Sequence, residues 1–293
     1  MAEKIAIITD TNSGITVETA KEINVILLSM PFIVNGISYY EGRNFTKDEF
    51  YKEMRNDSDI STSQPSPADV IDVWEEALKS YDTIVHIPMS SGLSSSCNTA
   101  KMLSEDYDGK VQVVDNKRIS ITQKQSVFDA VKLREQGLSA KEIKEKLEEM
   151  AYEASIYVAV DTLKYLKKGG RVTAAGAAIG SILNIKPILQ IQGDKLDAYA
   201  KSRGMKLAEK KLIEAVQKDI DERFKGDSNI CVAVAYSGED SVGENWLKKV
   251  QESFPQFDIE CDPLSLSIAC HTGEGALGIG CFKKIWCLIF KKL

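Results

Sequence analysis

Two hydroxyl-rich segments carry the strongest chemical signal in this sequence. Residues 61–67 read Ser-Thr-Ser-Gln-Pro-Ser-Pro ahead of a predicted helix, and residues 88–96 read Pro-Met-Ser-Ser-Gly-Leu-Ser-Ser-Ser between a predicted strand and a predicted helix. An open parallel sheet binds its ligands outside the carboxyl ends of its strands. Helix N-termini at that edge offer unpaired N–H groups and a partial positive charge, which nearby hydroxyls can extend into a socket for a carboxylate or a phosphate. The competing interpretation is that these residues only cap helices, as we expect of Ser66.

A serine hydrolase would use the same hydroxyls together with a histidine base. The chain has two histidines. His86 lies inside the apolar run 83–87 and is expected to be a satisfied core histidine, whereas His271 lies in a loop-like segment and is the more credible functional residue. Neither hydroxyl-rich segment contains Gly-x-Ser-x-Gly, so hydrolysis is the weaker alternative.

Two arginines and one aspartate are further candidates for an anion site. Arg171 follows two glycines, and Arg203 precedes Gly204. Because glycine permits tight turns, each arginine can be held on a loop with its planar fork turned to an oxyanion, or it can be an ordinary surface arginine. Asp10 ends the first predicted strand, where it serves either as a functional carboxylate or as a helix cap.

Missing motifs argue against other kinds of site. The chain has no Gly-x-x-x-x-Gly-Lys-Ser/Thr loop, and its Gly-x-Gly-x-x-Gly match at residues 273–278 lies too close to the C-terminus for a dinucleotide-binding unit. We interpret that match as a glycine-rich turn or strand. Six dispersed cysteines without a Cys-x-x-Cys pair, together with two histidines, argue against a metal site. We therefore expect neither a cofactor nor a metal.

Composition and charge define the class of protein. The 293 residues are 43% hydrophobic and 27% charged, which is typical of a soluble globular chain. The formal net charge of −6 does not favour nucleic acid as a partner. The N-terminal apolar run is too short for an export signal, and no stretch approaches the ~20 apolar residues of a transmembrane helix. We predict a cytoplasmic protein with reduced thiols.

Short strands alternate with helices along most of the chain, which predicts an α/β fold with largely parallel sheets. A soft boundary near residue 160 divides it into two α/β domains, 1–160 and 161–293. A hairpin is predicted over 32–40. The remaining strands are predicted at 4–9, 25–29, 83–87, 111–114, 156–160, 188–192, 230–235 and 258–261, and the helices at 17–23, 94–106, 121–136, 140–153, 205–224 and 242–253.

Three helix starts are marked by local chemistry. Thr46 and Ser139 each precede a glutamate by three residues, which is the capping-box pattern. Ser66 is followed by proline at the first helical position. We expect helices to begin directly after all three residues.

The segment 281–293 has the pattern of a short basic amphipathic helix. Its apolar residues recur at helical spacing, and its lysines lie away from the centre of that face. Such a helix can rest on an anionic bilayer surface as a peripheral membrane contact. The alternatives are that the face packs on the protein's own core or on a dimer partner, or that the segment arises from an altered reading frame. The apolar face consists of Phe282, Ile285, Trp286, Ile289, Phe290 and Leu293.

Six short motifs, in this order along the chain, together resemble the DegV family of bacterial fatty-acid-binding proteins. The resemblance implies a two-domain α/β protein that buries one long-chain fatty acid in a cleft between its domains. It also implies that the carboxylate is presented to a separate ATP-dependent fatty acid kinase subunit, which makes an acyl phosphate. The motifs are Thr9-Asp10-Thr11, Thr62-Ser63-Gln64-Pro65-Ser66, Ser90-Ser91-Gly92-Leu93-Ser94, Gly169-Gly170-Arg171, Ser202-Arg203-Gly204 and His271-Thr272-Gly273.

The resemblance also implies roles for particular residues. The hydroxyls of Thr62, Ser63 and Ser94 would bind the carboxylate. Arg171, Arg203 and His271 would serve the carboxylate end and the encounter with the kinase. In this interpretation the chain is a lipid-binding carrier and not an enzyme; the alternative is a self-contained hydrolase or acyltransferase that uses Ser94 or Ser63.

The chain departs from the family pattern at two places near these motifs. Residues 95–97 read Ser-Ser-Cys where the family usually has a small glycine-threonine step, and Glu274 stands where proline is frequent. The first departure bears on selectivity for the headgroup or the chain, and the second bears on kinase docking.

Overall fold

A four-stranded parallel sheet forms the centre of the N-terminal unit. The computed structural model describes residues 3–177, 185–193 and 195–285. The strand order is β2 (Val25–Leu28), β1 (Ile5–Asp10), β6 (Thr83–Ile87) and β7 (Val111–Val113), and every neighbouring pair is parallel. This sheet confirms the predicted α/β class and the predicted parallel pairing.

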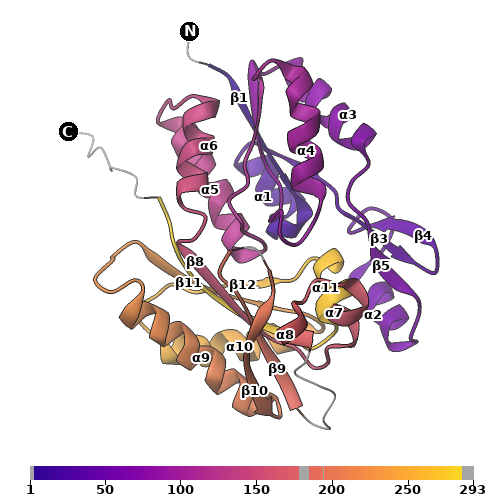
Figure 1. Ribbon diagram of the computed structural model, residues 1–293, viewed down its shortest axis with the longest axis vertical. Coiled ribbons are helices and arrows are strands. Elements are labelled where there is room, and N and C mark those ends of the chain that lie inside the picture. The colour runs from indigo at the N-terminus through magenta and orange to yellow at the C-terminus, as the bar shows by residue number, and fades with distance from the viewer. Residues whose placement is uncertain (1–2, 178–184, 194, 286–293) are drawn as a thin grey trace.

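Helices cover both faces of this sheet, as an all-parallel sheet requires. One face packs against α1 (Val17–Glu22), α5 (Ile121–Glu135) and α6 (Ala140–Glu149). The other packs against α3 (Pro67–Leu78) and α4 (Ser96–Ser104) (Figure 1). The carboxyl-terminal edge is therefore where loops can form a site.

A small antiparallel sheet extends from the side of the N-terminal unit. Its order is β4 (Ile37–Tyr40), β3 (Pro31–Val34) and β5 (Ile60–Thr62), and it packs with α2 (Lys47–Arg55). The hairpin of β3 and β4 confirms the one predicted over 32–40. Strand β5 occupies the start of the first hydroxyl-rich segment, which the sequence had placed in a loop.

The C-terminal unit is built on a six-stranded sheet whose pairing corrects the sequence expectation. Among the strands that the structure describes here, β11–β12 is the one parallel pair, and the other four pairs are antiparallel. The prediction of largely parallel sheets is thus wrong for this unit. The predicted strands β8 and β9 pair antiparallel with each other, and the two unpredicted strands, β10 and β13, add the other antiparallel pairs. The order is β10 (Asp197–Arg203), β9 (Ile185–Ile191), β8 (Ala154–Ala159), β13 (Leu277–Lys283), β11 (Ile230–Tyr236) and β12 (Glu260–Pro263).

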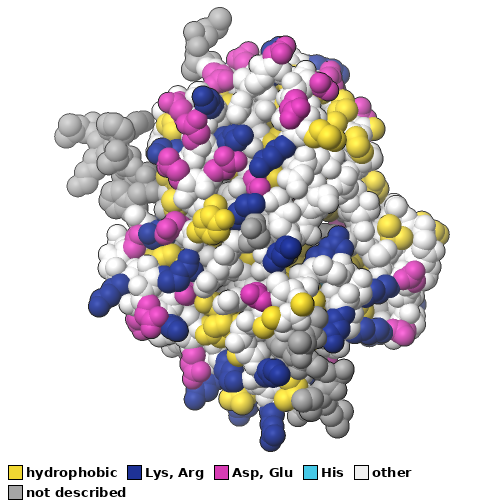
Figure 2. All heavy atoms as spheres, in the orientation of Figure 1, with side chains coloured by type: hydrophobic (Ala, Val, Ile, Leu, Met, Phe, Trp, Pro, Cys, Tyr) yellow, Lys and Arg dark blue, Asp and Glu magenta, His cyan; other side chains and the backbone are white. Residues whose placement is uncertain are grey.

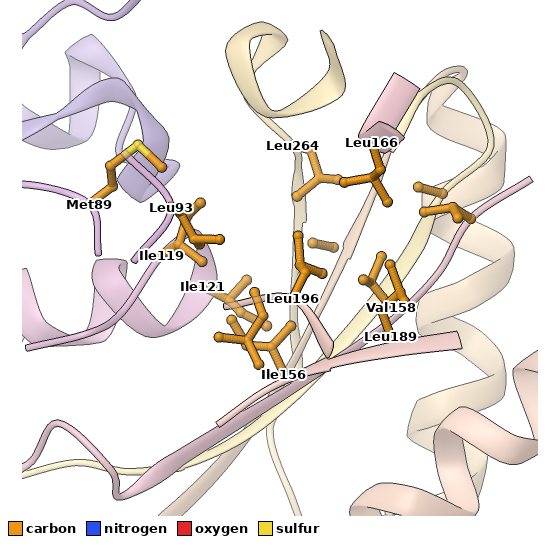
Figure 3. Close-up of a cluster of buried hydrophobic side chains, with 14 of the residues drawn as sticks. Met89, Leu93, Ile119, Ile121, Ile156, Val158, Leu166, Leu189, Leu196 and Leu264 are labelled. Carbon is orange, nitrogen blue, oxygen red and sulfur yellow. The ribbon is translucent and has the colours of Figure 1, made fainter. Parts of the chain in front are cut away.

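The two faces of this sheet have different neighbours. Helices α9 (Met205–Glu222) and α10 (Asp240–Ser253) cover one face. The other face turns toward the N-terminal unit, where apolar side chains from both units meet (Figure 3). Three short helices lie beside this junction: α7 (Lys164–Gly169), α8 (Ala174–Ala177) and α11 (Leu266–Thr272).

Predictions that depended on local chemistry are confirmed. Thr46, Ser66 and Ser139 all form capping boxes at the starts of α2, α3 and α6. The glycine-rich match at residues 273–278 runs through a turn at 274–275 into the first two residues of β13, in agreement with a glycine-rich turn or strand.

The boundary near residue 160 stays a proposal. Strand β8 pairs with β9 and β13, so a boundary just before β8 would keep the six-stranded sheet whole.

The start of the predicted C-terminal helix is a strand instead. Phe282 lies in β13 and is buried, and the backbone N–H of Ile285 donates to the Asp129 carboxylate (3.2 Å). Phe282 therefore belongs to the core and not to a membrane-facing surface. Residues 286–293, with the rest of that apolar face, lie outside the described residues. Among the described helices, none is long and apolar enough to cross a membrane.

Candidate ligand-binding site

One cavity gathers five of the six residues that the sequence singled out. Thr62, Ser63, Ser94, Arg171 and His271 all line it. It lies between the loops at the carboxyl-terminal edge of the parallel sheet and helices α7 and α11. The volume of the cavity is about 70 Å³.

Local folding explains how the hydroxyls reach this cavity. Strand β5 ends at Thr62, and the loop after β6 carries Ser94 just before α4 begins. The Ser94 hydroxyl oxygen accepts the Ser96 N–H (3.2 Å), which leaves its hydrogen to donate to a ligand. Ser63 is exposed and donates to the Gln64 carbonyl (3.0 Å). Ser94 is thus the better placed of the two serines.

His271 and Thr62 form a hydrogen-bonded pair across the two units. The Nε2 atom of His271 lies 2.9 Å from the Thr62 hydroxyl oxygen. Burial, together with the charge of Arg171, lowers the pKa of His271 to about 4, so the ring is neutral at pH 7. When Nε2 carries the proton, the ring donates to Thr62, and the Thr62 hydroxyl can donate onward to a ligand oxygen. His271 then positions Thr62.

A glycine makes room for this ring. A Cβ atom on Gly169 would lie only 2.2 Å from Nδ1 of His271. Close packing of α7 against the histidine therefore requires glycine at position 169, two residues before Arg171.

Arg171 links two loops at the edge of the cavity. Its guanidinium donates to the carbonyl of Leu93 (Nε, 3.4 Å) and to that of Gly169. Both acceptors are neutral carbonyls, so these contacts hold the side chain without cancelling its charge. The positive charge remains available to an anion in the cavity.

Arg203 is not brought to this cavity. It lies exposed at the end of β10, opposite Ile185 on β9. The expectation that it converges with Arg171 and His271 is therefore wrong for the cavity itself. The motif Ser202-Arg203-Gly204 ends a strand that the sequence analysis did not predict.

A second, apolar cavity lies next to the first. Its volume is about 60 Å³. Five lining residues are shared with the first cavity: Leu93, Ile119, Leu196, Ile268 and Thr272. The far wall is the inner face of the six-stranded sheet (Figure 3), where small residues leave space. Lining residues on that sheet include Ile156, Val158, Ile191, Ala235 and Gly278.

Asp10 does not line the first cavity but holds together the segments next to it. It is buried, and its carboxylate accepts the backbone N–H groups of Met89 (2.7 Å) and Asn12 (3.0 Å) and the Gln123 amide (3.2 Å). Burial raises its pKa to about 6 despite these donors. Of the two roles that the sequence left open, capping is the one that the structure shows, because Asp10 is the N-cap of the 3₁₀ turn Thr11–Ser13.

Sequence reasoning missed several polar residues that line the cavity. Asn12, Gln64, Ser267 and Thr272 are among them. Asn12 stands two residues after Asp10, and Thr272 directly follows His271, so proximity to a chosen residue was the only available signal. Ser267 had no such signal.

The arrangement does not assemble a serine hydrolase. The hydroxyl partner of His271 is Thr62 and not a serine, and Nδ1 of His271 has no hydrogen-bond partner within the described residues. A triad needs an acidic group at that nitrogen. In the described ranges, no group of three or more His, Cys, Asp or Glu side chains could hold a metal ion.

His86 lies in the core, as predicted, but it is not satisfied. It is buried against Trp74, and neither of its ring nitrogens has a hydrogen-bond partner within the described chain. Burial lowers its pKa to about 4. The expectation of a satisfied core histidine is corrected accordingly.

Comparison with known proteins agrees with this geometry. A DegV domain-containing protein of Staphylococcus aureus is 31% identical over 282 residues, which cover 96% of this chain and 99% of the relative. One of Listeria monocytogenes is 30% identical and covers 95% of this chain and 98% of its own length.

Solved structures give the same result. A structure described as DegV, a fatty acid binding protein from Bacillus subtilis, matches with a TM-score of 0.85 at 27% identity and covers 97% of this chain and all of its own. A fatty acid binding DegV family protein from Streptococcus agalactiae matches with a TM-score of 0.86 at 28% identity and the same coverage. The family model described as "Uncharacterised protein, DegV family" matches residues 4–284. The chain therefore belongs to the DegV family.

Proposed function

We propose that this protein binds one long-chain fatty acid across the two adjacent cavities. The carboxylate lies among Thr62, Ser94 and Arg171, and the hydrocarbon chain lies along the apolar cavity. The observation that carries this proposal is that a hydroxyl-lined cavity lies directly beside one lined almost wholly by carbon, with five lining residues in common. Relatives described as fatty acid binding support the same ligand class.

The energetics favour such a ligand. Burying a saturated C16 chain at ~0.8 kcal/mol per methylene supplies on the order of 10 kcal/mol. A carboxylate buried without partners would cost several kcal/mol, and hydroxyl donors offset that cost. The apolar cavity therefore dominates affinity, and the hydroxyls decide which end of the ligand lies at the mouth.

We further propose that the protein presents the carboxylate to a separate ATP-dependent kinase. A carboxylate oxygen would attack the γ-phosphorus of ATP, ADP would leave, and an acyl phosphate would form. Thr62 and Ser94 donate hydroxyls to the carboxylate. The Arg171 guanidinium shares its donors with the Leu93 and Gly169 carbonyls, so it contributes charge without a tight bidentate salt bridge that would weaken the nucleophile. The sequence contains no nucleotide-binding motif, so the separate kinase would bind the ATP.

The surface beside the cavity supports a charged encounter. Helix α7 carries Lys164, Lys167 and Lys168, and Figure 2 shows Lys and Arg side chains gathered over α7 and the adjoining part of α2. Arg203 lies exposed on the same unit. Lys164 and Lys168 form ion pairs with Asp57 and Asp59, which reduces the local positive charge. Lys167 and Arg203 are therefore the positive charges that we assign to an encounter with an acidic partner surface.

Mass spectrometry of an organic extract of the purified protein tests the proposal. We expect one long-chain fatty acid per chain, and a kinase-coupled assay with ATP should convert it to an acyl phosphate that hydroxylamine traps. An extract without lipid, together with esterase activity, would instead support the hydrolase. Heat-denatured protein carried through the same extraction controls for lipid from the medium.

A further inference from the structure

Hydrogen bonds from several segments hold both the backbone and the side chain of Asn12. It lies in the 3₁₀ turn Thr11–Ser13, which Asp10 caps and Gly14 closes in a left-handed conformation (φ 75°). Its backbone N–H donates to Asp10 (3.0 Å), and its carbonyl accepts the Ser120 N–H (3.0 Å). Its side chain is buried and lines the polar cavity.

Two serines from the other unit fix the orientation of the amide. The Asn12 Oδ1 atom accepts the hydroxyls of Ser265 (2.7 Å) and Ser267. The Ser265 oxygen also accepts the Ile268 N–H at the start of α11, so its hydrogen is directed to Asn12. The opposite orientation would set the amide oxygen against the Met89 sulfur, which is also an acceptor. Nδ2 is therefore the atom on the Met89 side.

Among the described residues, the Asn12 amide nitrogen has no strong acceptor. Its hydrogen-bond partner is the thioether sulfur of Met89, at 2.8 Å, and thioethers are weak acceptors. Met89 lines the same cavity. A buried N–H donor gains more from a carboxylate oxygen, because a hydrogen bond to an ionised acceptor is about twice as strong as a neutral one.

We propose that Asn12 selects the headgroup by donating an N–H of Nδ2 to a carboxylate oxygen of the ligand in place of the Met89 sulfur. This inference rests on the proposed function and deepens it. The amide N–H can donate to either an alcohol or a carboxylate, but its bond to the ionised oxygen is about twice as strong, so it favours an ionised acid over an alcohol of the same chain length. The two serines position Asn12 and make no contact with the ligand in this role.

Substitution Asn12→Asp tests the inference with almost no change in shape. The new carboxylate can still accept both serine hydroxyls, but it offers no donor and repels a second carboxylate. We expect the affinity for hexadecanoic acid to fall at least a hundredfold at pH 7.5, and that for hexadecanol to change by less than threefold. Asn12→Ala removes the donor without adding charge, and we expect roughly a tenfold loss for the acid alone.

Asn116→Asp is the matched control. Asn116 is also a buried asparagine, but it donates to Ser126 (2.6 Å) and does not line the cavity. It should leave the ratio of acid to alcohol affinity unchanged. Thermal melting of each variant checks that the fold is kept.

The outcomes separate this inference from the proposed function. If the wild-type protein binds neither hexadecanoic acid nor hexadecanol, the proposed function fails. If the wild-type protein binds the acid and both Asn12 variants keep the wild-type ratio of acid to alcohol affinity, the inference about Asn12 is overturned and the function stands. A parallel loss of both ligands also overturns it, since that result assigns Asn12 to the fold.

Discussion

The two larger sheets of this protein contribute different parts of the candidate site. The parallel sheet contributes loops: Asn12 follows β1, and Met89 and Ser94 follow β6. The six-stranded sheet contributes a face: Val158, Ala235 and Gly278 lie along its strands and line the apolar cavity. Polar groups therefore come from loops that follow strands, and room for a hydrocarbon comes from the face of a sheet.

Sheet topology explains this division. Helices cover both faces of the parallel sheet, so its accessible part is the edge at the carboxyl ends of the strands. The six-stranded sheet has α9 and α10 on one face only, and its other face is free to pack against the N-terminal unit. Small residues on that face, such as Ala235 and Gly278, leave a space where larger residues would complete the core.

Helix α11 joins the two halves. One side of it carries Ser267, His271 and Thr272 to the polar cavity, and the other side is buried against the small sheet and α2. The Glu41 carboxylate accepts the Leu266 N–H at its start (2.9 Å). Both cavities are thus lined from both units, but the sheet face lines only the apolar one, so a substitution on that face alters the apolar half separately.

Filling the apolar half should have the largest effect. A Cβ atom on Gly278 would make only ordinary contacts, the closest being 3.6 Å from Ala235, so Gly278→Leu should fold. The rest of the leucine side chain would occupy the cavity and displace about four methylenes of the ligand. At ~0.8 kcal/mol each, affinity for a C16 acid should fall more than a hundredfold in a titration.

Gly278→Ala is the control for this change, and it should cost less than tenfold. If Gly278→Leu binds a C16 acid like the wild type, the hydrocarbon does not lie on this face, and the division of the site between loops and sheet face is wrong.

Removing one hydroxyl from the polar half should have a smaller effect. Ser94→Ala deletes one charge-assisted hydrogen bond, worth ~1.5–3 kcal/mol, so binding or acyl-phosphate formation should weaken by roughly ten- to a hundredfold. Thermal melting should show a folded protein.

Ser95→Ala is the matched control for Ser94, because Ser95 is exposed and its side chain makes no capping bond. Unchanged binding and unchanged kinase-coupled turnover of Ser94→Ala would remove this residue from the site.

The same comparison explains what the sequence could predict. Parallel strands and their helices follow local signals, such as a buried apolar run or a capping box at Thr46, and these predictions are confirmed. The antiparallel strand β13 carries glycines at 278 and 280 that weaken any strand signal. Its place between β8 and β11 depends on pairing across most of the chain, which no local window contains.

The site shows the same limit. Thr62 and Ser94 were found because hydroxyls at strand-to-helix junctions form a recognisable local pattern. Asn12 was missed because its role depends on Ser265 and Ser267, more than 250 positions away in sequence. Arg203 was misplaced at the cavity because its strand, β10, was not predicted.

A third prediction concerns the pH dependence of stability that the buried histidine of the N-terminal unit, His86, should cause. Burial lowers the pKa of His86 from its usual value of 6.5 to about 4. The folded protein therefore binds this proton less well than the unfolded chain, so stability is lost as pH falls from 6.5 toward 4. Between pH 7.5 and 5, His86 should account for about 2 kcal/mol of that loss.

Chemical denaturation of wild type and His86→Phe across this pH range measures the effect. His271 has a similarly lowered pKa, and Asp10 has a raised pKa that acts in the opposite sense, but both are present in each protein and cancel in the difference. Equal pH dependence of the two proteins would show that His86 is protonated or hydrated in the fold.

The smallest effect on binding should come from Arg203, which belongs to the C-terminal unit but to neither cavity. Because its side chain is exposed on β10, Arg203→Ala should leave fatty acid affinity within about twofold of wild type. Turnover by an added kinase should fall more than lipid occupancy, because an exposed charge outside both cavities acts on the encounter with a partner rather than on the bound ligand. Lys201→Ala, two positions earlier on the same side of the strand, is the matched control for loss of one exposed positive charge. If Arg203→Ala abolishes occupancy and leaves turnover per bound lipid intact, the residue belongs to the ligand site, and the separation of polar loops from sheet face must be redrawn to include the end of β10.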